Sequence, residues 1–222
     1  SSKPGAGGQF LRSARTSSAA AFNAAGWRVI STCRDPSLAG LSGEVHPLDV
    51  TEQASVNALV TALNDEPVDL LLNNAGIFGP RTYAYDEIDY DAWSEVLSID
   101  AMAPIRVAAA LTENVAASDR KLMVFISSVM GSIAETATGE GMIYRSSKAC
   151  LNAAVNVMGN GLQSRSIACV LLHPGWVRTD MGGPTAAIDT MTSVRGMFDV
   201  IEGLKAKDNG RFINYDGTEI PW

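Results

Sequence analysis

Short apolar runs alternate along the chain with longer stretches in which apolar residues recur at helical spacing. The short runs are typical of buried strands, and the longer stretches are typical of amphipathic helices. Because near-continuous apolar strands that alternate with helices are covered on both faces, the pattern predicts an α/β fold with a doubly wound parallel sheet flanked by helices. The predicted strands are Trp27–Thr32, Val68–Leu72, Leu122–Ser127, Ile167–Leu172 and Arg211–Tyr215, and the predicted helices are Val56–Leu63, about Tyr90–Asn114, about Gly141–Leu162 and Met191–Leu204.

Two residues mark expected features of these helices. Thr51 precedes the first predicted helix, and we expect it to be the N-cap because its hydroxyl can accept from a backbone N–H. Pro104 lies inside the long stretch from about Tyr90 to Asn114. Since a proline has no N–H to donate, we expect an irregularity in the helix at that point.

Length and charge limit the classes of function. A chain of 222 residues without internal repeats or linkers is expected to form one domain, residues 1–222. Its 46% of hydrophobic residues excludes a disordered chain and provides for a sizeable core. The net charge of −7 argues against a nucleic-acid partner and against an anionic membrane surface. The apolar runs are far shorter than the roughly 20 residues of a membrane-spanning helix, so we expect no membrane association.

Cysteines and histidines indicate an intracellular protein without a metal site. Cys33, Cys150 and Cys169 occur singly, with no C-x-x-C pair, and are expected to be reduced thiols of a cytoplasmic protein. His46 and His173 lie far apart in the sequence, and we expect His173 to be a wall residue rather than a catalytic base. The serine- and arginine-rich start of the chain leaves a transit peptide open as an alternative.

A hydroxyl, a phenol and an ammonium are predicted to converge in the second half of the chain. Tyr144 and Lys148 are four residues apart on a predicted helix and therefore share one face. Ser128 follows a predicted strand, at the edge where parallel sheets place their ligands. A nearby ammonium lowers the pKa of a phenol toward the working range, and a serine hydroxyl can hold a carbonyl oxygen as charge develops on it. This set suits the reduction of a carbonyl.

The same residues belong to a larger set of motifs, which resembles the short-chain dehydrogenase/reductase family and in particular its C-factor and sniffer-like carbonyl reductase branch. The resemblance covers roughly residues 19–222. It implies a Rossmann-type domain, an NADP(H)-dependent oxidoreductase that reduces a carbonyl or oxidises an alcohol, and a homodimer or homotetramer. The motifs are Asn73–Gly76, Ser128–Gly131, Tyr144–Lys148, His173–Gly183 and Tyr215–Trp222.

The resemblance also implies roles for individual residues. Tyr144 would donate the proton, Ser128 would orient the carbonyl, and Lys148 would hold the nicotinamide ribose and tune the tyrosine. Arg34 would face the 2′-phosphate and favour NADP over NAD, because the acidic residue that binds the ribose of NAD is absent there. The other cofactor-binding residues would be Asp49 and Val50 at the adenine edge, Asn74, Ala75 and Gly76 at the adenosine ribose, and Pro174, Gly175, Val177 and Thr179 beside the nicotinamide.

Asp100 departs from the family pattern, which has an asparagine here that helps to anchor a water-mediated proton relay to the lysine. An aspartate has nearly the same shape but lacks the amide donor and can be charged. A carboxylate near Lys148 favours the ammonium and would weaken its help to Tyr144. We therefore expect Asp100 to belong to the catalytic set and to slow the relay.

Residues 1–18 depart further from the family, which begins with a buried strand and a Thr-Gly-x-x-x-Gly-x-Gly loop. In that loop the glycines let the backbone approach the pyrophosphate. This chain reads SSKPGAGGQFLRSARTSS, without an apolar strand, and fits the motif in neither register. Because Met102 is the first methionine, we do not expect the natural start to be included as written. The segment could be divergent, could be a break in the sequence, or could be a remodelled loop that holds phosphate through Gly5, Gly7, Gly8 and Arg12.

Two classes of function follow from these observations. The first is an NADPH-dependent carbonyl reductase that acts on a small-molecule carbonyl or alcohol, and it is supported by the set Ser128, Tyr144 and Lys148. The alternative is a cofactor-poor relative that serves as a signalling or interaction module, and it is supported by residues 1–18 and by Asp100. Cofactor binding distinguishes the two classes.

Overall fold

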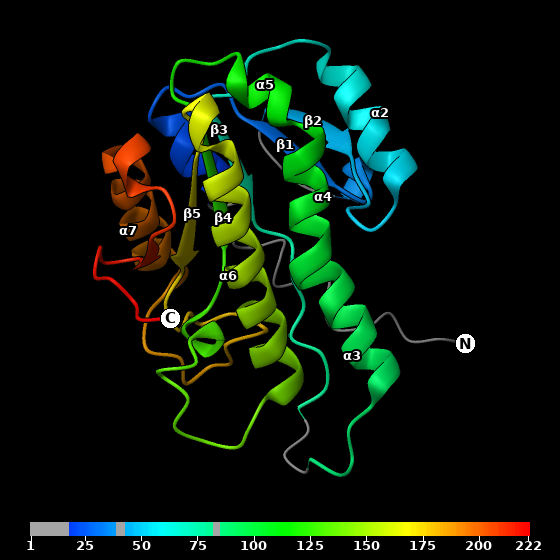
Figure 1. Cartoon of the computed structure of the whole chain (residues 1–222), viewed down its shortest axis with the longest axis vertical. Coiled ribbons are helices and arrows are strands. Elements are labelled where there is room, and N and C mark those ends of the chain that lie inside the picture. The colour runs from blue at the N-terminus through cyan, green and yellow to red at the C-terminus, as the bar shows by residue number, and fades with distance from the viewer. Residues whose placement is uncertain (1–17, 39–42, 82–84) are drawn as a thin grey trace.

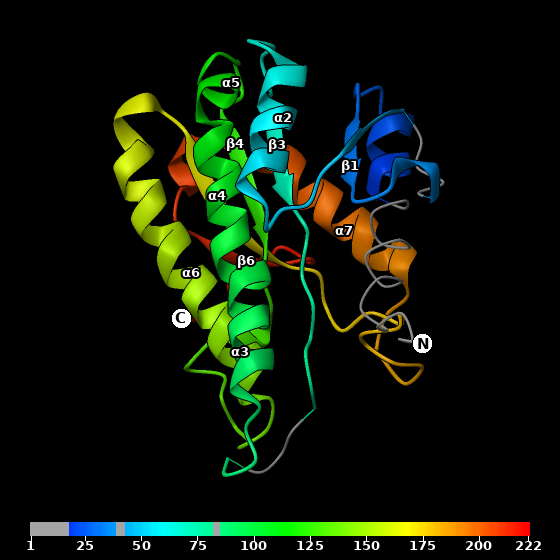
Figure 2. The same cartoon turned by 90° about the vertical axis from the view of Figure 1, so that its right-hand side faces the viewer.

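Strands and helices alternate along the chain, with helices on both faces of parallel strands (Figures 1 and 2). This computed structural model describes residues 18–38, 43–81 and 85–222. The predicted α/β fold with a parallel sheet flanked by helices is confirmed. The strands are β1 (Ile30–Cys33), β2 (Glu44–Pro47), β3 (Leu70–Asn73), β4 (Leu122–Ile126), β5 (Ala168–His173) and β6 (Phe212–Asn214), and the helices are α2 (Gln53–Leu63), α3 (Tyr90–Leu97), α4 (Ala103–Ala110), α5 (Thr112–Ala116), α6 (Met142–Leu162) and α7 (Thr190–Gly203).

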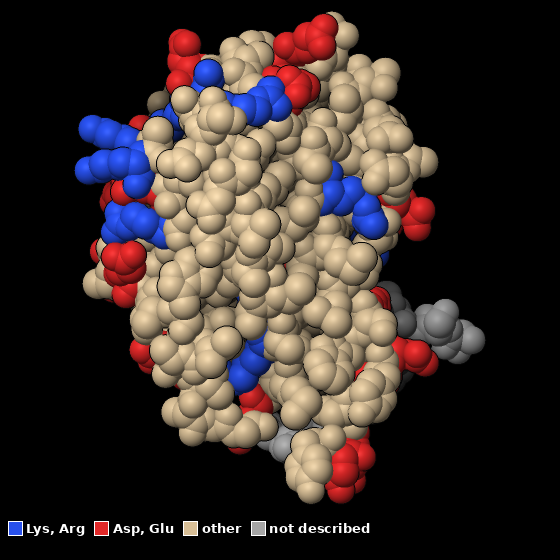
Figure 3. All heavy atoms as spheres, in the orientation of Figure 1, with Lys and Arg blue, Asp and Glu red and all other residues tan. Residues whose placement is uncertain are grey.

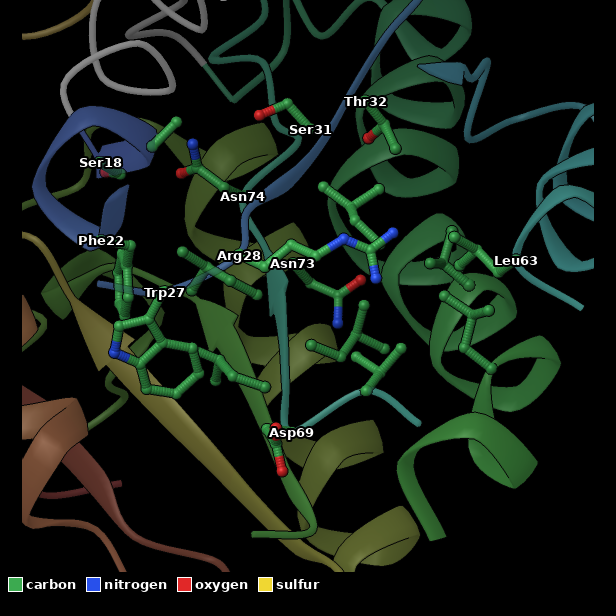
Figure 4. Close-up of a pocket in the computed structure, with 18 of the residues that line it drawn as sticks. Ser18, Phe22, Trp27, Arg28, Ser31, Thr32, Leu63, Asp69, Asn73 and Asn74 are labelled. Carbon is green, nitrogen blue, oxygen red and sulfur yellow. The ribbon is translucent and has the colours of Figure 1, made fainter. Parts of the chain in front are cut away.

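Within the described residues, the parallel strands form two sheets rather than one. β1 pairs with β2, whereas β3, β4, β5 and β6 pair in that order. Leu122 of β4 lies opposite Leu70 of β3 and opposite Ala168 of β5, so the three neighbouring strands are in register. A cavity of about 770 Å³ lies between β1 and β3 (Figure 4).

Side chains of β4 alternate between two apolar layers, because successive residues of a strand point to opposite faces. Met123 and Phe125 pack with Leu151 of α6 on one face of the larger sheet. Leu122 and Val124 pack on the other face, where α7 and the helical residues 18–24 lie. A third cluster joins α2 to α4. The larger sheet is therefore covered on both sides, which explains why its strands are apolar throughout.

The predicted long helix is broken near Pro104. A π-helical turn, Ser98–Met102, separates α3 from α4, and the N–H of Ala103 donates to the carbonyl of Ser98. Pro104 has no N–H for the carbonyl of Asp100, four residues earlier, so the regular α-helical pattern cannot continue through this point. The expected irregularity is confirmed, and it carries Asp100 into the interior.

Two local predictions were wrong or incomplete. Helix α2 begins at Gln53 after Glu52, and no side-chain cap is formed, so Thr51 is not the N-cap. The hydroxyl of Thr51 instead donates to the Asp49 carboxylate at 2.6 Å. The strand Glu44–Pro47 was missed because it lies at the outer edge of its sheet and alternates little in burial, so it lacks an apolar run.

The face formed by α4 and α6 carries few charged side chains, which gather mainly around its margins (Figure 3). Val157 of α6 is exposed on the surface, together with Met142 at the beginning of the same helix. Of the helices in the described ranges, none is long and apolar enough to cross a membrane.

Candidate active site

Ser128, Tyr144 and Lys148 are buried side chains that meet beyond the carboxyl end of β4. Ser128 begins the short turn Val129–Gly131, and its Oγ accepts from the N–H of Met130 at 3.2 Å. Tyr144 and Lys148 occupy the first turns of α6, and the Lys148 Nζ lies 5.6 Å from the centre of the Tyr144 ring. The structure therefore brings together the three residues that the sequence singled out for chemistry.

Close packing between the turn after β4 and helix α6 holds this arrangement. A Cβ at Gly131 would lie 2.8 Å from the backbone carbonyl carbon of Lys148, so only a glycine allows this approach. The Asn152 amide donates to the Gly131 carbonyl at 3.3 Å and accepts from the Ser127 hydroxyl at 2.6 Å. These contacts fix the end of β4 against the helix that carries the phenol and the ammonium.

Burial dominates the electrostatics of Tyr144. It raises the pKa of the phenol above its ordinary value, while the charge of Lys148 and a hydrogen bond with Ser128 act to lower that pKa. Lys148 thus acts in the expected direction, but in this state it does not bring the phenol pKa down to the working range. The expectation of a net lowered pKa is not met, because desolvation disfavours the phenolate more than the ammonium stabilises it.

Asp100 forms a buried ion pair with Lys148. One carboxylate oxygen accepts from the N–H of Ile77 at 2.7 Å, and the other lies 3.4 Å from the Lys148 Nζ. Burial raises the pKa of Asp100, which the lysine charge opposes. Burial acts to lower the pKa of Lys148, but the charges of Asp100 and Tyr144 outweigh it and the pKa of the ammonium is raised. Asp100 therefore favours the ammonium, as its sequence position led us to expect.

A stack of side chains covers the Tyr144 ring. We did not expect this stack from the sequence. The Phe78 ring lies parallel to the Tyr144 ring with 4.5 Å between the centroids. The guanidinium of Arg81 lies over the Phe78 ring, 4.5 Å from its centroid. The same guanidinium donates to the backbone carbonyl of Met181 at 2.7 Å. The position of Phe78 and Arg81 just after the Asn73–Gly76 turn was the feature of the sequence that could have placed them near the site. The stack connects the loop after β3 to the loop after β5, directly beside the phenol.

The residues expected beside the nicotinamide follow β5, and Gly76, which was expected at the adenosine ribose, follows β3 at the same edge. A Cβ at Gly76 would lie 3.3 Å from Asp100 Oδ1, and a Cβ at Gly175 would lie 2.6 Å from a side-chain carbon of Ile188. The φ of Gly175 is +83°, which a residue with a side chain adopts only with strain. Pro174 accepts from Ser193, while Thr179 donates to the carbonyl of Val177 at 3.1 Å. Gly76 thus brings the backbone close to the ion pair, whereas Gly175 brings it close to Ile188 and Tyr215.

The residues expected at the adenine end lie around β1 and the chain that follows β2. Arg34 is exposed just after β1. Hydrogen bonds from Thr51 lower the pKa of Asp49. The charge of Arg34 also lowers this pKa, so Arg34 lies near the Asp49 carboxylate.

The carbonyl of Val50 accepts from Arg106 at 3.0 Å. Asn74 and Ala75 line the cavity between β1 and β3. Gly5, Gly7, Gly8 and Arg12 lie outside the described residues.

Comparison with known proteins identifies the family. A family model described as enoyl-(acyl carrier protein) reductase matches residues 13–199. The C-signal of Myxococcus xanthus is 42% identical over 167 residues, which are 75% of this chain and 100% of that protein. The chain belongs to the short-chain dehydrogenase/reductase family. Its branch is the one expected from the motifs, that of the C-factor and the sniffer-like carbonyl reductases.

Solved structures of the family superpose on most of the chain. The carbonyl reductase Sniffer of D. melanogaster gives a TM-score of 0.84 at 28% identity, covering 97% of this chain and 96% of that one. A short-chain dehydrogenase/reductase from Burkholderia multivorans with bound NADP gives a TM-score of 0.85 at 28% identity, with the same coverage. The Rossmann-type architecture of the family is therefore that of this chain.

Proposed function

We propose that this protein is an NADP(H)-dependent oxidoreductase that reduces a small-molecule carbonyl, or oxidises the corresponding alcohol, with Tyr144 as the proton donor. The observation that carries the proposal is the convergence of buried Ser128, Tyr144 and Lys148 at the carboxyl edge of the larger sheet. The family membership and the NADP-bound relative from Burkholderia multivorans support it. When bound, the cofactor would supply or accept the hydride.

Each of the three side chains has a distinct part in this chemistry. The Ser128 hydroxyl holds the carbonyl oxygen while negative charge develops on it. Tyr144 donates its phenolic proton to that oxygen, and the ammonium of Lys148 stabilises the phenolate that remains. The stacked Phe78 ring excludes water from one side of the phenol. Asp100 holds Lys148 in the charged form, and its carboxylate also competes for the positive charge that Tyr144 needs.

The turns after β3 and β5 suit a bound dinucleotide cofactor. A Cβ at Gly76 would lie 3.4 Å from the Lys148 Nζ, so the backbone itself forms the wall beside Lys148. A Cβ at Gly175 would collide with Ile188 and Tyr215. We assign Asn74, Ala75 and Gly76 to the ribose of the adenosine, and Pro174, Gly175, Val177 and Thr179 to the nicotinamide. Asp49 and Val50 would lie at the adenine.

Arg34 would select NADPH over NADH by pairing with the 2′-phosphate. It is exposed, lies just after β1, and no acidic residue of the ribose-binding kind takes its place. We propose to titrate the full chain with NADPH and with NADH and to follow nucleotide fluorescence. The expected result is tighter binding of NADPH, and Arg34→Ala should lower that affinity about tenfold without changing the affinity for NADH. Arg165→Ala, which removes an exposed arginine paired with Glu113, is the matched control.

A second candidate is a cofactor-poor signalling or interaction module. Within the described part of the chain the sheet is divided beside Asn74, and this favours the second candidate because residues expected to bind adenosine then lie at a cavity. A relative that is 42% identical bears the name C-signal. If neither nucleotide binds at millimolar concentration while circular dichroism shows a folded chain, this candidate replaces the reductase. Saturable binding of NADPH would exclude it.

We also propose that the chain forms a homodimer or homotetramer through α4 and α6. Figure 3 shows few charges on this face, and Val157 is an exposed apolar residue there. Charged residues are depleted in the centres of protein interfaces. Light scattering of the chain and of Val157→Asp tests the proposal, since the substitution should shift the protein to monomer.

A further inference from the structure

Arg81 is an exposed cation one aromatic ring away from the Tyr144 ring. Its guanidinium lies 4.5 Å from the centre of the Phe78 ring, and that ring is stacked on the Tyr144 ring. Among the described residues, its one hydrogen-bond acceptor is the carbonyl of Met181, at 2.7 Å. Because an arginine carries several N–H donors in a planar fork, most of the guanidinium can bind a further acceptor.

No carboxylate of the described residues forms an ion pair with Arg81, unlike several other arginines of the chain. The arginines that do form ion pairs with carboxylates are Arg28, Arg120, Arg165, Arg178 and Arg211. The charge of Arg81 is therefore not compensated within the described part of the chain. A negatively charged group of a ligand can pair with it without displacing a carboxylate of the protein.

The loop that carries Arg81 is anchored near the catalytic residues. The N–H of Ile77 donates to the Asp100 carboxylate at 2.7 Å. A Cβ at Gly79, where φ is +72°, would lie 2.7 Å from a side-chain carbon of Val96, so the loop backbone packs directly against α3. Together with the hydrogen bond to the loop after β5, these contacts hold the guanidinium in place. Binding of a ligand then costs little side-chain freedom.

Two other cations near the phenol are already engaged. Lys148 is paired with Asp100 in a buried site, and the charges of these two residues act in opposite directions on the pKa of Tyr144. Arg145 follows Tyr144 on α6, and its guanidinium donates to the carbonyl of Glu140 at 2.9 Å. The charge of Arg81 does not contribute to the shift in the pKa of Tyr144, so Arg81 lies too far from the phenol to alter proton transfer. Its position suits a group that is remote from the reacting carbonyl.

We propose that Arg81 determines the substrate class of the proposed reductase, which is a carbonyl compound that carries a carboxylate about the length of an aromatic ring away from its carbonyl. This inference rests on the proposed oxidoreductase function. With the carbonyl at Ser128 and Tyr144, the carboxylate would lie against the guanidinium, whose planar fork matches two carboxylate oxygens. The Phe78 ring, between the phenol and the guanidinium, would give the spacer an apolar surface.

The probes are 4-carboxybenzaldehyde and its neutral methyl ester, which share one ring and one aldehyde and differ in charge. Each turnover consumes one NADPH and one proton, so NADPH absorbance measures the rate. The measured quantity is the ratio of kcat/KM for the acid to kcat/KM for the ester. Added NaCl should lower this ratio, because salt screens an exposed ion pair. The different reactivity of the two aldehydes cancels when the ratio is compared between the protein and its variants.

Arg81→Met removes the charge and keeps an apolar side chain. It should lower the ratio about fivefold, mainly through a higher KM for the acid. Arg81→Lys keeps the charge without the fork and should lower the ratio less. Arg145→Met, near the phenol, and Arg165→Met, at an arginine paired with Glu113, should leave the ratio unchanged. Loss of the contact with Met181 alone would affect both aldehydes equally, so the ratio separates recognition from a structural role.

Two results would overturn this inference and leave the proposed function in place. The first is reduction of both aldehydes with a ratio that Arg81→Met does not change. The second is an equal change of the ratio in Arg145→Met, which would mean a general effect of charge. No turnover with a wider panel of carbonyls would count against the proposed function instead.

If neither aldehyde is reduced, calorimetric titration of the full chain with 4-(hydroxymethyl)benzoate, the alcohol that corresponds to the acid probe, decides the role of Arg81. Binding that Arg81→Met weakens and Arg165→Met does not would support the inference. The absence of binding, or equal binding by the unsubstituted chain and Arg81→Met, would overturn it.

Discussion

β4 and β5 pair along five positions and are covered on both faces by apolar clusters, whereas β1 and β3 are separated by a cavity of about 770 Å³. The first region carries Ser128 and, through α6, Tyr144 and Lys148. The second region carries the residues expected at the adenosine half of a cofactor. The residues proposed for proton transfer thus belong to a continuous sheet, whereas the residues proposed to bind the adenosine half of the cofactor border the cavity.

This difference means that the intact geometry of Ser128, Tyr144 and Lys148 does not show by itself whether a cofactor binds. Ser128, Tyr144 and Lys148 are held by contacts within β4, the turn after it and α6, as the close approach at Gly131 illustrates. None of these contacts requires β1. A chain of this kind can keep the geometry of its catalytic residues and still bind nucleotide weakly, so activity and affinity have to be measured separately.

The largest expected effect comes from the catalytic side of the comparison. Tyr144→Phe removes the phenolic proton and should lower the rate of NADPH-dependent carbonyl reduction by about 10²- to 10⁴-fold while leaving nucleotide affinity unchanged. The rate is measured by NADPH absorbance with a substrate selected from a panel of carbonyls. Tyr90→Phe, at a tyrosine that is exposed, is the control. A Tyr144→Phe protein with an unchanged rate would exclude Tyr144 as the proton donor.

The next prediction compares the packing around β4 and β5 with the packing at the cavity, through a leucine-to-alanine substitution in each region. Leu151 is 1% exposed in the cluster between α6 and the sheet, whereas Leu63 lines the cavity. Leu151→Ala should lower the free energy of unfolding by about 3–4 kcal/mol, and Leu63→Ala by about 1–2 kcal/mol, because a side chain at a cavity has fewer contacts to lose. Chemical denaturation measures both. Equal losses would contradict the comparison and would indicate that the cavity is filled in solution.

A third prediction concerns pH and His173 at the carboxyl end of β5. Burial lowers its pKa to about 4 from an ordinary 6.5, with the charge of Asp216 opposing, and its Nδ1 has no partner among the described residues. Between pH 6.5 and 4 the unfolded chain binds a proton that the folded chain does not, so stability falls as pH falls through this range.

The expected loss from His173 is about 2–3 kcal/mol by pH 4, on the basis of the shift in its pKa. His173→Gln should remove this part of the pH dependence, and denaturation curves at pH 7, 5.5 and 4 measure it. His46→Gln, at the edge strand β2, serves as the matched histidine control. Identical pH profiles for His173→Gln and the unsubstituted chain would show that the imidazole does not titrate as its burial indicates.

The sequence allowed the catalytic side to be predicted better than the cavity side, and the reason is physical. Tyr144 and Lys148 share a helix face and Ser128 ends an apolar strand, so local periodicity was enough to place them together. The edge strand β2 has no apolar run, and the stack of Phe78 on Tyr144 joins residues from different loops. The separation of β1 from β3 within the described residues depends on which strands become neighbours, and an apolar pattern does not specify that.

The smallest expected effect concerns Asp100, the residue that separates this catalytic set from the family pattern. Its carboxylate lies 3.4 Å from the Lys148 Nζ in a buried site. The negative charge of Asp100 therefore offsets part of the stabilisation that the ammonium would give to a Tyr144 phenolate. Asp100→Asn keeps the shape and restores an amide donor. We expect it to raise the turnover rate a few-fold and to shift the pH-rate profile toward lower pH, because the charge of Lys148 then acts on Tyr144 unopposed.

Steady-state kinetics between pH 6 and 10 measure both changes. Asp199→Asn on α7 is the control for loss of a carboxylate elsewhere. If the rate and the profile of Asp100→Asn match those of the unsubstituted chain, the ion pair has no effect on proton transfer, and the role of Asp100 is then to accept the hydrogen bond from the backbone N–H of Ile77.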